Sequence, residues 1–135
     1  MKRTLPILTF VLLAFFMVRP AVSADLQKGN AAYQRGDYAA AVSIWTSLAE
    51  QGNASAQFFL GVMYEFGEGV PQDKTTTVKW WKLAAEQGFA SAQFNLGFMY
   101  GKGQGVPQNY KTAVKWYRLA AEQGHAGAQF NLGLM

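Results

Sequence analysis

The 135-residue chain contains no cysteine and a single histidine, His125. Without cysteine there are no disulfide bonds, no thiolate nucleophiles and no thiolate metal sites. One histidine without a matched set of ligands does not define a metal site. No nucleophile, base and orienting group occur together as a catalytic set. The sequence therefore predicts no catalytic residue, no metal and no cofactor.

A hydrophobic run long enough to span a bilayer is also missing. The apolar run at residues 7–18 has about twelve residues, whereas a transmembrane helix needs roughly 20. A short basic start, Lys2-Arg3, precedes this run, and small residues ending at Ala24 follow it. This order predicts a signal peptide at residues 1–24, with a permanent membrane anchor as the alternative. For a bacterial source we expect an exported protein, periplasmic or secreted, without stable membrane insertion after cleavage.

The net charge gives little support for a nucleic-acid partner. Twelve lysines and arginines oppose eight aspartates and glutamates, for a formal net charge of +4. Lys2, Arg3 and Arg19 belong to the predicted signal peptide, so nine basic residues oppose eight acidic ones in the mature chain, whose net charge is +1. Binding to nucleic-acid phosphates requires a basic surface. We therefore expect no nucleic acid among the partners.

The chain does contain an internal repeat. Residues 54–89, ASAQFFLGVMYEFGEGVPQDKTTTVKWWKLAAEQGF, are followed directly by residues 90–125, ASAQFNLGFMYGKGQGVPQNYKTAVKWYRLAAEQGH, and 24 of the 36 positions are identical. A third copy, AGAQFNLGLM, occupies residues 126–135. A fixed period of this length is typical of stacked repeat proteins. The pattern favours an interaction scaffold over a reaction site.

Each unit has the pattern of two helices joined by a glycine-containing turn. The helices of the two long units are expected at residues 54–64, 75–87, 90–100 and 111–123. Gly61 and Gly97, inside the first helices, each cost about 1 kcal/mol relative to alanine, and we expect them to allow close helix packing. The glycine-rich segments at residues 67–71 and 101–105 resemble phosphate-binding loops. Without a preceding strand or a following Lys-Ser or Lys-Thr pair, they are predicted to be turns.

The aromatic residues are predicted to form the core. Trp45, Trp81 and Tyr117 share one repeat position and are expected to be buried, whereas Trp80 and Trp116 are expected to be partly exposed. Large side chains between the paired helices are expected to be Leu60, Met63, Tyr64, Val78, Trp81 and Leu83.

Three glutamates, Glu50, Glu86 and Glu122, recur at 36-residue intervals. Units of a stack hold them too far apart for paired-carboxylate chemistry, which needs a separation of about 5 to 9.5 Å. Each lies at the end of a helix, where a negative charge is unfavourable. We therefore expect them to bond to neighbouring backbone or lysine rather than only to solvent.

The two long units resemble the Sel-one-like repeat (SLR), a relative of the tetratricopeptide repeat. The shared elements are A-x-A-Q-x-x-L-G-x-M-Y, then G-x-G-V-P-Q, then W-[YW]-x-L-A-A-E-Q-G. The resemblance implies an all-α fold, a right-handed superhelical solenoid of αα-hairpins whose first helices line a concave groove. It also implies an adaptor or scaffold that binds a protein or peptide partner, and it leaves the oligomeric state open.

The same resemblance divides the chain into units. After the signal peptide we expect a tetratricopeptide-like helix pair at 25–53, SLR repeats at 54–89 and 90–125, and the first helix of a truncated SLR repeat at 126–135. Capped arrays present a polar outer face, and this last helix lacks its partner. We expect a fragment of a longer array, the alternative being a terminal helix that packs on the last pair.

Positions that differ between the two long copies are free to contact something other than the stack. On the first helices they follow one stripe at steps of three and four. The predicted partner-binding residues on this stripe are Phe59, Val62, Asn95, Phe98 and Lys102. The alternative is that these are surface positions that have drifted. Large apolar residues on an exposed face favour an interface.

The predicted function is that of a non-catalytic interaction scaffold or adaptor in the cell envelope. It would bind a peptide or protein segment in the groove of the helical repeats. The alternatives are a secreted envelope hydrolase that acts on cell-wall or β-lactam material, as proposed for some exported relatives, and a regulatory subunit of an envelope enzyme.

Overall fold

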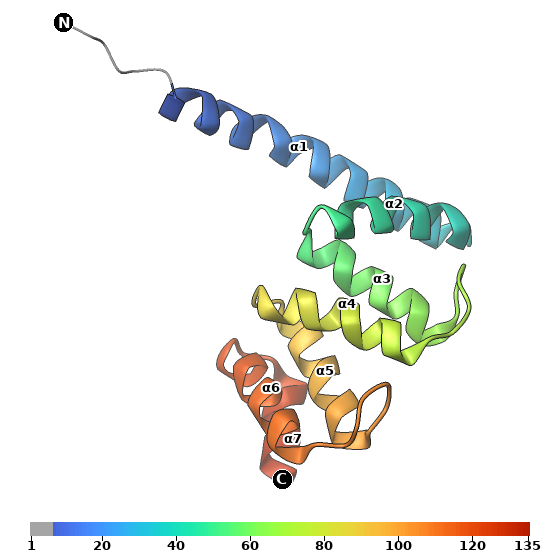
Figure 1. The fold of residues 1–135 in the computed structure, drawn as a ribbon, viewed down its shortest axis with the longest axis vertical. Helices are drawn as coiled ribbons and strands as arrows, with labels where there is room; N and C mark the ends of the chain where they lie inside the picture. The colour runs from blue at the N-terminus through green and yellow to red at the C-terminus, as the bar shows by residue number, and fades with distance from the viewer. Residues whose placement is uncertain (1–6) are drawn as a thin grey trace, which may run out of the picture.

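The computed structural model describes the backbone of residues 7–135 and the side chains of residues 21–135. This part of the chain holds seven α-helices and no strand. They are α1 (Ile7–Gln34), α2 (Tyr38–Glu50), α3 (Ala54–Phe66), α4 (Lys74–Glu86), α5 (Ala90–Lys102), α6 (Tyr110–Glu122) and α7 (Ala126–Leu134). Each helix packs against the next along the chain, and the array runs from α1 to α7 down Figure 1. The predicted all-α repeat solenoid is confirmed.

Helix α1 runs without a break through Ala24, the predicted signal cleavage site. Lys2 and Arg3, the basic start of the predicted signal peptide, lie outside the described residues. Among the residues that are described, no helix has the length and apolar character needed to cross a membrane. Gly29 and Ala32, which pack in the core of the first helix pair, both follow Ala24 in the chain.

Capping groups set the helix ends. Helices α3 and α5 each run two residues past their predicted ends, because Gly67 and Gly103 terminate them in the left-handed conformation, with φ of 67° and 66°. Helices α4 and α6 each begin one residue before their predicted starts. Asp73 and Asn109 cap them there by accepting hydrogen bonds from backbone N–H groups of the first turn. The glycine-rich segments are the predicted turns.

The predicted aromatic column is the core of successive helix pairs. Trp45, Trp81 and Tyr117 are 3%, 4% and 5% exposed. Each ring lies across a glycine of the facing first helix. A Cβ at Gly61 would lie 2.4 Å from Trp81 Cδ1, and one at Gly97 would lie 2.8 Å from Tyr117 Cδ1. The recurring glycine therefore makes room for the aromatic ring, which confirms the predicted close packing.

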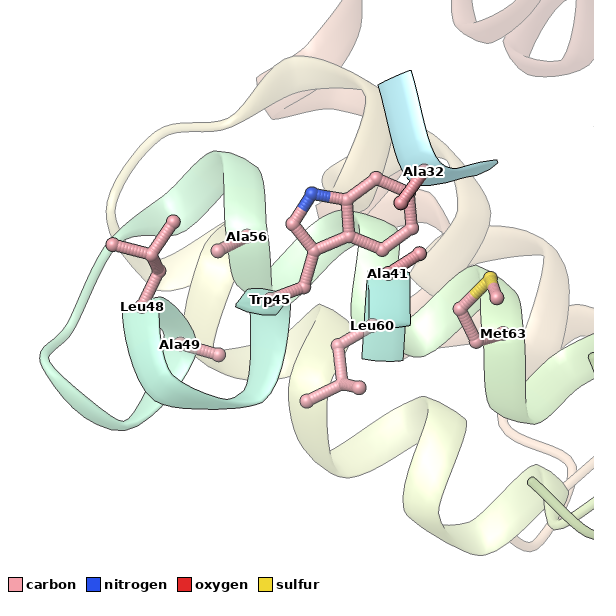
Figure 2. Packing of buried hydrophobic residues seen from close by; sticks show 8 residues of the cluster. All are labelled: Ala32, Ala41, Trp45, Leu48, Ala49, Ala56, Leu60 and Met63. Atoms are coloured by element: carbon pink, nitrogen blue, oxygen red, sulfur yellow. The ribbon is translucent and has the colours of Figure 1, made fainter. Parts of the chain in front are cut away.

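Figure 2 shows the first of these cores, in which small and large side chains pack together with the Trp45 indole. Ala32 and Ala41 lie beside the ring, and both are fully buried. Leu60 and Met63 enter the same cluster from α3. Because α3 contributes to the core of the preceding unit, each unit covers an apolar face that its neighbour cannot cover alone.

Two predictions about large side chains were wrong. Leu83 is 39% exposed and does not lie between the paired helices. It follows the buried Trp81 by two positions, and residues two apart on a helix point in different directions. Trp116 is 8% exposed and packs with Val78 and Leu96 in the second core cluster. Its counterpart Trp80 is partly buried, as predicted.

One glutamine in the first helix of each long unit, Gln57 or Gln93, bonds to the unit before it. Gln57 Nε2 donates to Ala49 O at 3.2 Å, and Gln93 Nε2 donates to Ala85 O at 3.1 Å. Both glutamines are buried, and Oε1 of Gln93 accepts a hydrogen bond from Gln123 at 2.8 Å. These bonds give a further donor to carbonyl groups at the end of a second helix, which also accept the N–H groups of Gly52 and Gly88 at 3.0 Å. They explain physically why the A-x-A-Q and A-E-Q-G motifs occur together.

Replacement of Gln93 by leucine is expected to destabilise the protein by about 1 kcal/mol, because the hydrogen bonds of its side chain with Ala85 O and Gln123 would be lost, while Ala85 O keeps the N–H of Gly88 at 3.0 Å. Gln129 occupies the same repeat position but is exposed, so Gln129→Leu should change stability by less than about 0.5 kcal/mol. Urea unfolding of the two purified variants measures the difference. Equal midpoints for both variants would contradict the proposed role of the buried bond.

The recurring glutamates do not bond as predicted. Glu50, Glu86 and Glu122 are exposed, and within the described part of the chain the ion pairs join other residues, Lys28 to Asp25 and Lys74 to Glu65. The backbone itself ends these helices, with Gly52, Gly88 and Gly124 in the left-handed conformation after them. The carboxylates therefore stay in water, where high dielectric weakens the unfavourable interaction with the helix end.

Candidate functional site: two grooves beside the first helices

Two grooves are formed where first helices meet their neighbours. The N-terminal groove, of about 450 Å³, lies between α1 and α3 and is lined by Asn30, Tyr33, Gln34, Trp45, Phe58, Phe59, Val62 and Met63. The C-terminal groove, of about 320 Å³, lies beside α5 and α7 and is lined by Phe98, Gly101, Lys102, Tyr110, Tyr117, Asn131, Leu134 and Met135. Both combine aromatic walls with a few amide and hydroxyl groups, the composition typical of sites that bind organic ligands or peptides.

The structure divides the predicted partner-binding residues between these grooves. Phe59 and Val62 line the N-terminal groove, and Phe98 and Lys102 line the C-terminal groove. Asn95 is half-buried and lines neither of the two. The five residues therefore do not form one continuous site.

The predicted residues differ in how far they are open to a partner. Phe59 is half-buried, because its ring stacks on Trp45 of the preceding unit with centroids 4.9 Å apart. Val62 is also half-buried, against the second core cluster. Phe98, at the same repeat position as Val62, is 40% exposed, and Lys102 is exposed. The most accessible apolar contact among the five is therefore Phe98.

Sequence comparison between the two long copies missed the groove residues supplied by other units. Asn30 and Tyr33 come from α1, and Asn131 and Leu134 come from α7. Neither helix belongs to a complete copy of the 36-residue unit, so a comparison of complete copies contains no signal for these four. When Gly29 is aligned with Gly61, Asn30 takes the same repeat position as Val62. This correspondence could have identified Asn30 as a groove residue.

Two tyrosines in the grooves keep their protons at neutral pH. A hydrogen bond with the Glu68 side chain, together with burial and the negative charge of that carboxylate, raises the pKa of Tyr33. Burial raises the pKa of Tyr117, and a hydrogen bond with the Asn131 side chain partly opposes the effect. Both hydroxyl groups are therefore neutral and can donate or accept hydrogen bonds.

His125 has a structural role that its sequence position did not indicate. Its Nδ1 accepts a hydrogen bond from Ala128 N at 3.2 Å and so caps α7. Its ring stacks on Phe94 with centroids 4.5 Å apart. Among the described residues, no group of three or more histidine, cysteine, aspartate or glutamate side chains is placed to hold a metal ion.

A chain of stacked helix pairs with open grooves along its first helices defines the class of α-helical repeat proteins. Within that class, the sequence pattern of the Sel1 repeat matches residues 54–89 and 90–125. The chain therefore belongs to the Sel1 repeat family, as its resemblance to the SLR motif predicted. Proteins of this family generally act as protein-interaction scaffolds, and the fold is typically non-catalytic.

Solved structures support the family and the fold. A Sel1 repeat protein from Oxalobacter formigenes is 42% identical, with a TM-score of 0.77 over 81% of this chain and 45% of its own. A protective antigen present in uropathogenic Escherichia coli strains, which displays an SLR fold, is 41% identical, with a TM-score of 0.80 over 87% of this chain and 26% of its own. The chain thus spans less than half the length of either.

A more distant structure shares the fold alone. Cysteine-rich protein B of Helicobacter pylori is 20% identical, with a TM-score of 0.66 over 85% of this chain and 95% of its own. The present chain has no cysteine, so the shared fold does not depend on cysteine pairs. The comparison with curated proteins found no match.

Proposed function

We propose that the chain is a non-catalytic adaptor of the cell envelope that holds a peptide segment of a partner protein along its first helices. The observation that carries this proposal is the position of Phe98, which is 40% exposed in the C-terminal groove and differs between the two long copies. An exposed aromatic ring in a groove is the type of side chain that dominates binding energy at protein interfaces.

The five residues on the variable stripe would have different roles in this interaction. Phe98 and Val62, one repeat apart, would bind apolar side chains of the peptide. Lys102 would attract an acidic group, and Asn95 would hydrogen-bond to the peptide backbone between the grooves. Phe59 would act mainly as a wall of the N-terminal groove, because its ring already stacks on Trp45.

A charge placed at Phe98 is expected to weaken peptide binding at least tenfold, because a carboxylate in the groove must lose water without gaining a partner. Peptides selected from a displayed library on the purified protein would be titrated against Phe98→Glu. The matched control is Phe66→Glu, since Phe66 is also an exposed phenylalanine, at 68%, and lines neither groove. Equal affinity for both variants, with folding intact, would disprove the role of the groove.

The proposed envelope location rests on residues 1–24, whose basic start, apolar run and small residues have the order of a secretory signal. Cleavage after Ala24 would leave Gly29 and Ala32 in place to pack the first helix pair. Mass spectrometry of the protein from a fractionated cell should find Asp25 at its N-terminus in the exported fraction. An intact N-terminus in the cytoplasm would contradict this location.

A further inference from the structure

The N-terminal groove is walled by aromatic rings that contact one another in a continuous row. The ring centroids of Tyr33 and Trp45 lie 5.9 Å apart, and those of Trp45 and Phe59 lie 4.9 Å apart. Phe58 extends the row, with its centroid 5.6 Å from that of Phe59. All four residues line the groove. Because the face of an aromatic ring carries partial negative charge, rings gathered around a cavity attract a cation.

The row of rings has a buried floor and accessible walls. Trp45 is 3% exposed, and a Cβ at Gly29 would lie 2.3 Å from its Nε1, so the polar edge of the indole faces the backbone of α1. Tyr33, Phe58 and Phe59 are half-buried. The surface that a ligand meets in this groove therefore consists mainly of the tyrosine ring and the two phenylalanine rings.

A carboxylate lies directly behind this wall. The side chain of Glu68, in the turn after α3, is hydrogen-bonded to the side chain of Tyr33. Its Oε2 atom is buried and has no hydrogen-bond partner. The ion pairs among the described side chains join other residues. A partly buried carboxylate without a counter-ion produces a negative potential in its surroundings, because the low dielectric of the protein screens it weakly.

The remaining lining of the groove does not oppose a positive charge. Among the residues that line it, none is a lysine, an arginine or a histidine, and Asn30 and Gln34 add amide groups. Arg35 follows Gln34 but is exposed and does not line the groove. Residues 25–73 contain two lysines and arginines against six aspartates and glutamates, a net charge of −4. The groove therefore lies in the acidic part of the chain.

The C-terminal groove occupies the equivalent place two units along the array, and its chemistry is different. Three lining positions of the N-terminal groove, Tyr33, Gln34 and Phe59, correspond to Gly101, Lys102 and Asn131. The second groove thus has a lysine and lacks two of the aromatic rings. The cation-attracting character belongs to the N-terminal groove and is not a general property of the repeat.

We propose that the N-terminal groove binds an arginine side chain of the partner peptide, with the guanidinium against the rings of Tyr33, Phe58 and Phe59. A guanidinium is planar, always charged and weakly hydrated, and it stacks on aromatic faces. Its N–H groups would donate to the amide oxygens of Asn30 and Gln34. This inference rests on the proposed function and gives the bound peptide a direction, with arginine toward α1 and an acidic group toward Lys102.

Other side chains fit the N-terminal groove less well. An aliphatic or aromatic side chain would contact the rings but would leave Glu68 without a counter-ion and the two amides without partners. An acidic side chain would be repelled by Glu68. A lysine ammonium is more strongly hydrated than a guanidinium and cannot stack on a ring as a plane.

Two synthetic peptides of about five residues test the charge and shape of the ligand separately. Both are alanine peptides with blocked ends, and they carry either arginine or citrulline at the centre, which has nearly the same shape but no charge. NMR titration of the purified full chain should show saturable binding of the arginine peptide, at least about threefold tighter than the citrulline peptide. The difference should shrink as salt rises. Equal affinities, or no saturable binding of the arginine peptide, would overturn the inference.

The repeat supplies a matched change for the carboxylate. Gln104 occupies the repeat position of Glu68, so Glu68→Gln is compatible with the turn while it removes the charge. This variant should reduce the preference for arginine over citrulline to less than about twofold. Glu50→Gln removes a charge from an exposed residue that lines neither groove, and the preference should remain. An equal reduction in both variants would mean unspecific attraction and would overturn the site.

The aromatic wall is tested by replacing one ring at a time. Phe59→Leu keeps apolar bulk but removes the ring, and it should weaken the arginine peptide at least about threefold. Phe66→Leu is the control, because Phe66 is exposed and lines neither groove. Equal affinities of the two variants would overturn the inference. Circular dichroism and thermal unfolding check that each variant remains folded.

Phe98→Glu separates this inference from the proposed function. It should leave the affinity for the arginine peptide unchanged while it weakens peptides from the displayed library. Equal binding of the arginine and citrulline peptides, together with loss of library peptides in Phe98→Glu, would overturn the arginine site and keep the proposed function. Loss of the arginine peptide in Phe98→Glu with no loss in Phe59→Leu would place arginine in the C-terminal groove and would also overturn the inference.

Discussion

Replacement of Gly61 by alanine is expected to destabilise the protein by about 3 kcal/mol, although alanine is the better helix former by about 1 kcal/mol. The new Cβ would lie 2.4 Å from both Cδ1 and Nε1 of Trp81. The indole cannot easily move, because it is 4% exposed and its Nε1 donates to Phe58 O at 3.0 Å. The substitution would overpack the core and leave a buried N–H without its acceptor.

Gly133 provides the control for this prediction. It occupies the same repeat position in α7, but nothing lies within 4 Å of a Cβ built there. Gly133→Ala should therefore leave stability unchanged or raise it by up to about 1 kcal/mol. Urea unfolding followed by far-UV circular dichroism measures both variants, with comparison of midpoints and slopes. A stabilising Gly61→Ala would mean that the indole relaxes freely and that the glycine–aromatic contact does not set the helix spacing.

The same substitution should also affect the N-terminal groove. Phe58 lines this groove, and its carbonyl holds the indole of Trp81. A displaced indole would shift the backbone of α3 that carries Phe59 and Val62. The spacing of the helix pair thus connects the core to the shape of the proposed binding site.

Replacement of Gly105 by alanine is expected to destabilise the protein by about 3–4 kcal/mol. Gly105 has a φ of 68°, a conformation that costs an alanine about 1–2 kcal/mol. A Cβ there would also lie 2.4 Å from Lys74 O and 2.7 Å from Lys74 C, and a backbone group of a helix cannot turn away as a side chain can. Overpacking of this kind typically costs a further 1–3 kcal/mol.

A substitution at Gly124 separates the conformational cost from the cost of overpacking. Its φ of 88° is also left-handed, but nothing lies within 4 Å of its Cβ position. Gly124→Ala should therefore lose only the conformational part, about 1–2 kcal/mol. Thermal and urea unfolding of the two variants give the difference. Equal losses in Gly105→Ala and Gly124→Ala would show that the turn does not press on the preceding unit.

The first prediction concerns a contact between the two helices of one unit, and the second a contact between neighbouring units. Both kinds of contact give the array its continuous shape. A stack in which each unit touches only its neighbours depends on every such contact. The grooves are built from residues of adjacent units, so a loosened contact would disturb binding as well as stability.

Much of the fold could be predicted because its signals are local or periodic. The 36-residue repeat, the glycine turns and the burial of Trp45, Trp81 and Tyr117 follow from the spacing and size of residues. The exceptions have physical causes. Leu83 and Trp116 have the same apolar character as the core residues. Their exposure depends on which helix covers them, and periodicity within one helix does not contain that information.

The candidate site could be predicted only in part for the same reason. Comparison of the two copies identified Val62 and Phe98 as variable positions, but it could not tell that one is half-buried and the other 40% exposed. Nor could it find Asn30 and Asn131, which reach the grooves from other helices.

The amino-acid sequence by itself determined that this protein is a stack of helix pairs, since residue size and repeat period decide which faces must be buried. The tertiary structure alone decided which faces stay open. Exposure of a side chain depends on the neighbouring unit that covers it, as the contrast between half-buried Trp80 and buried Trp116 at one repeat position shows. The grooves therefore appear only when the units are assembled in space.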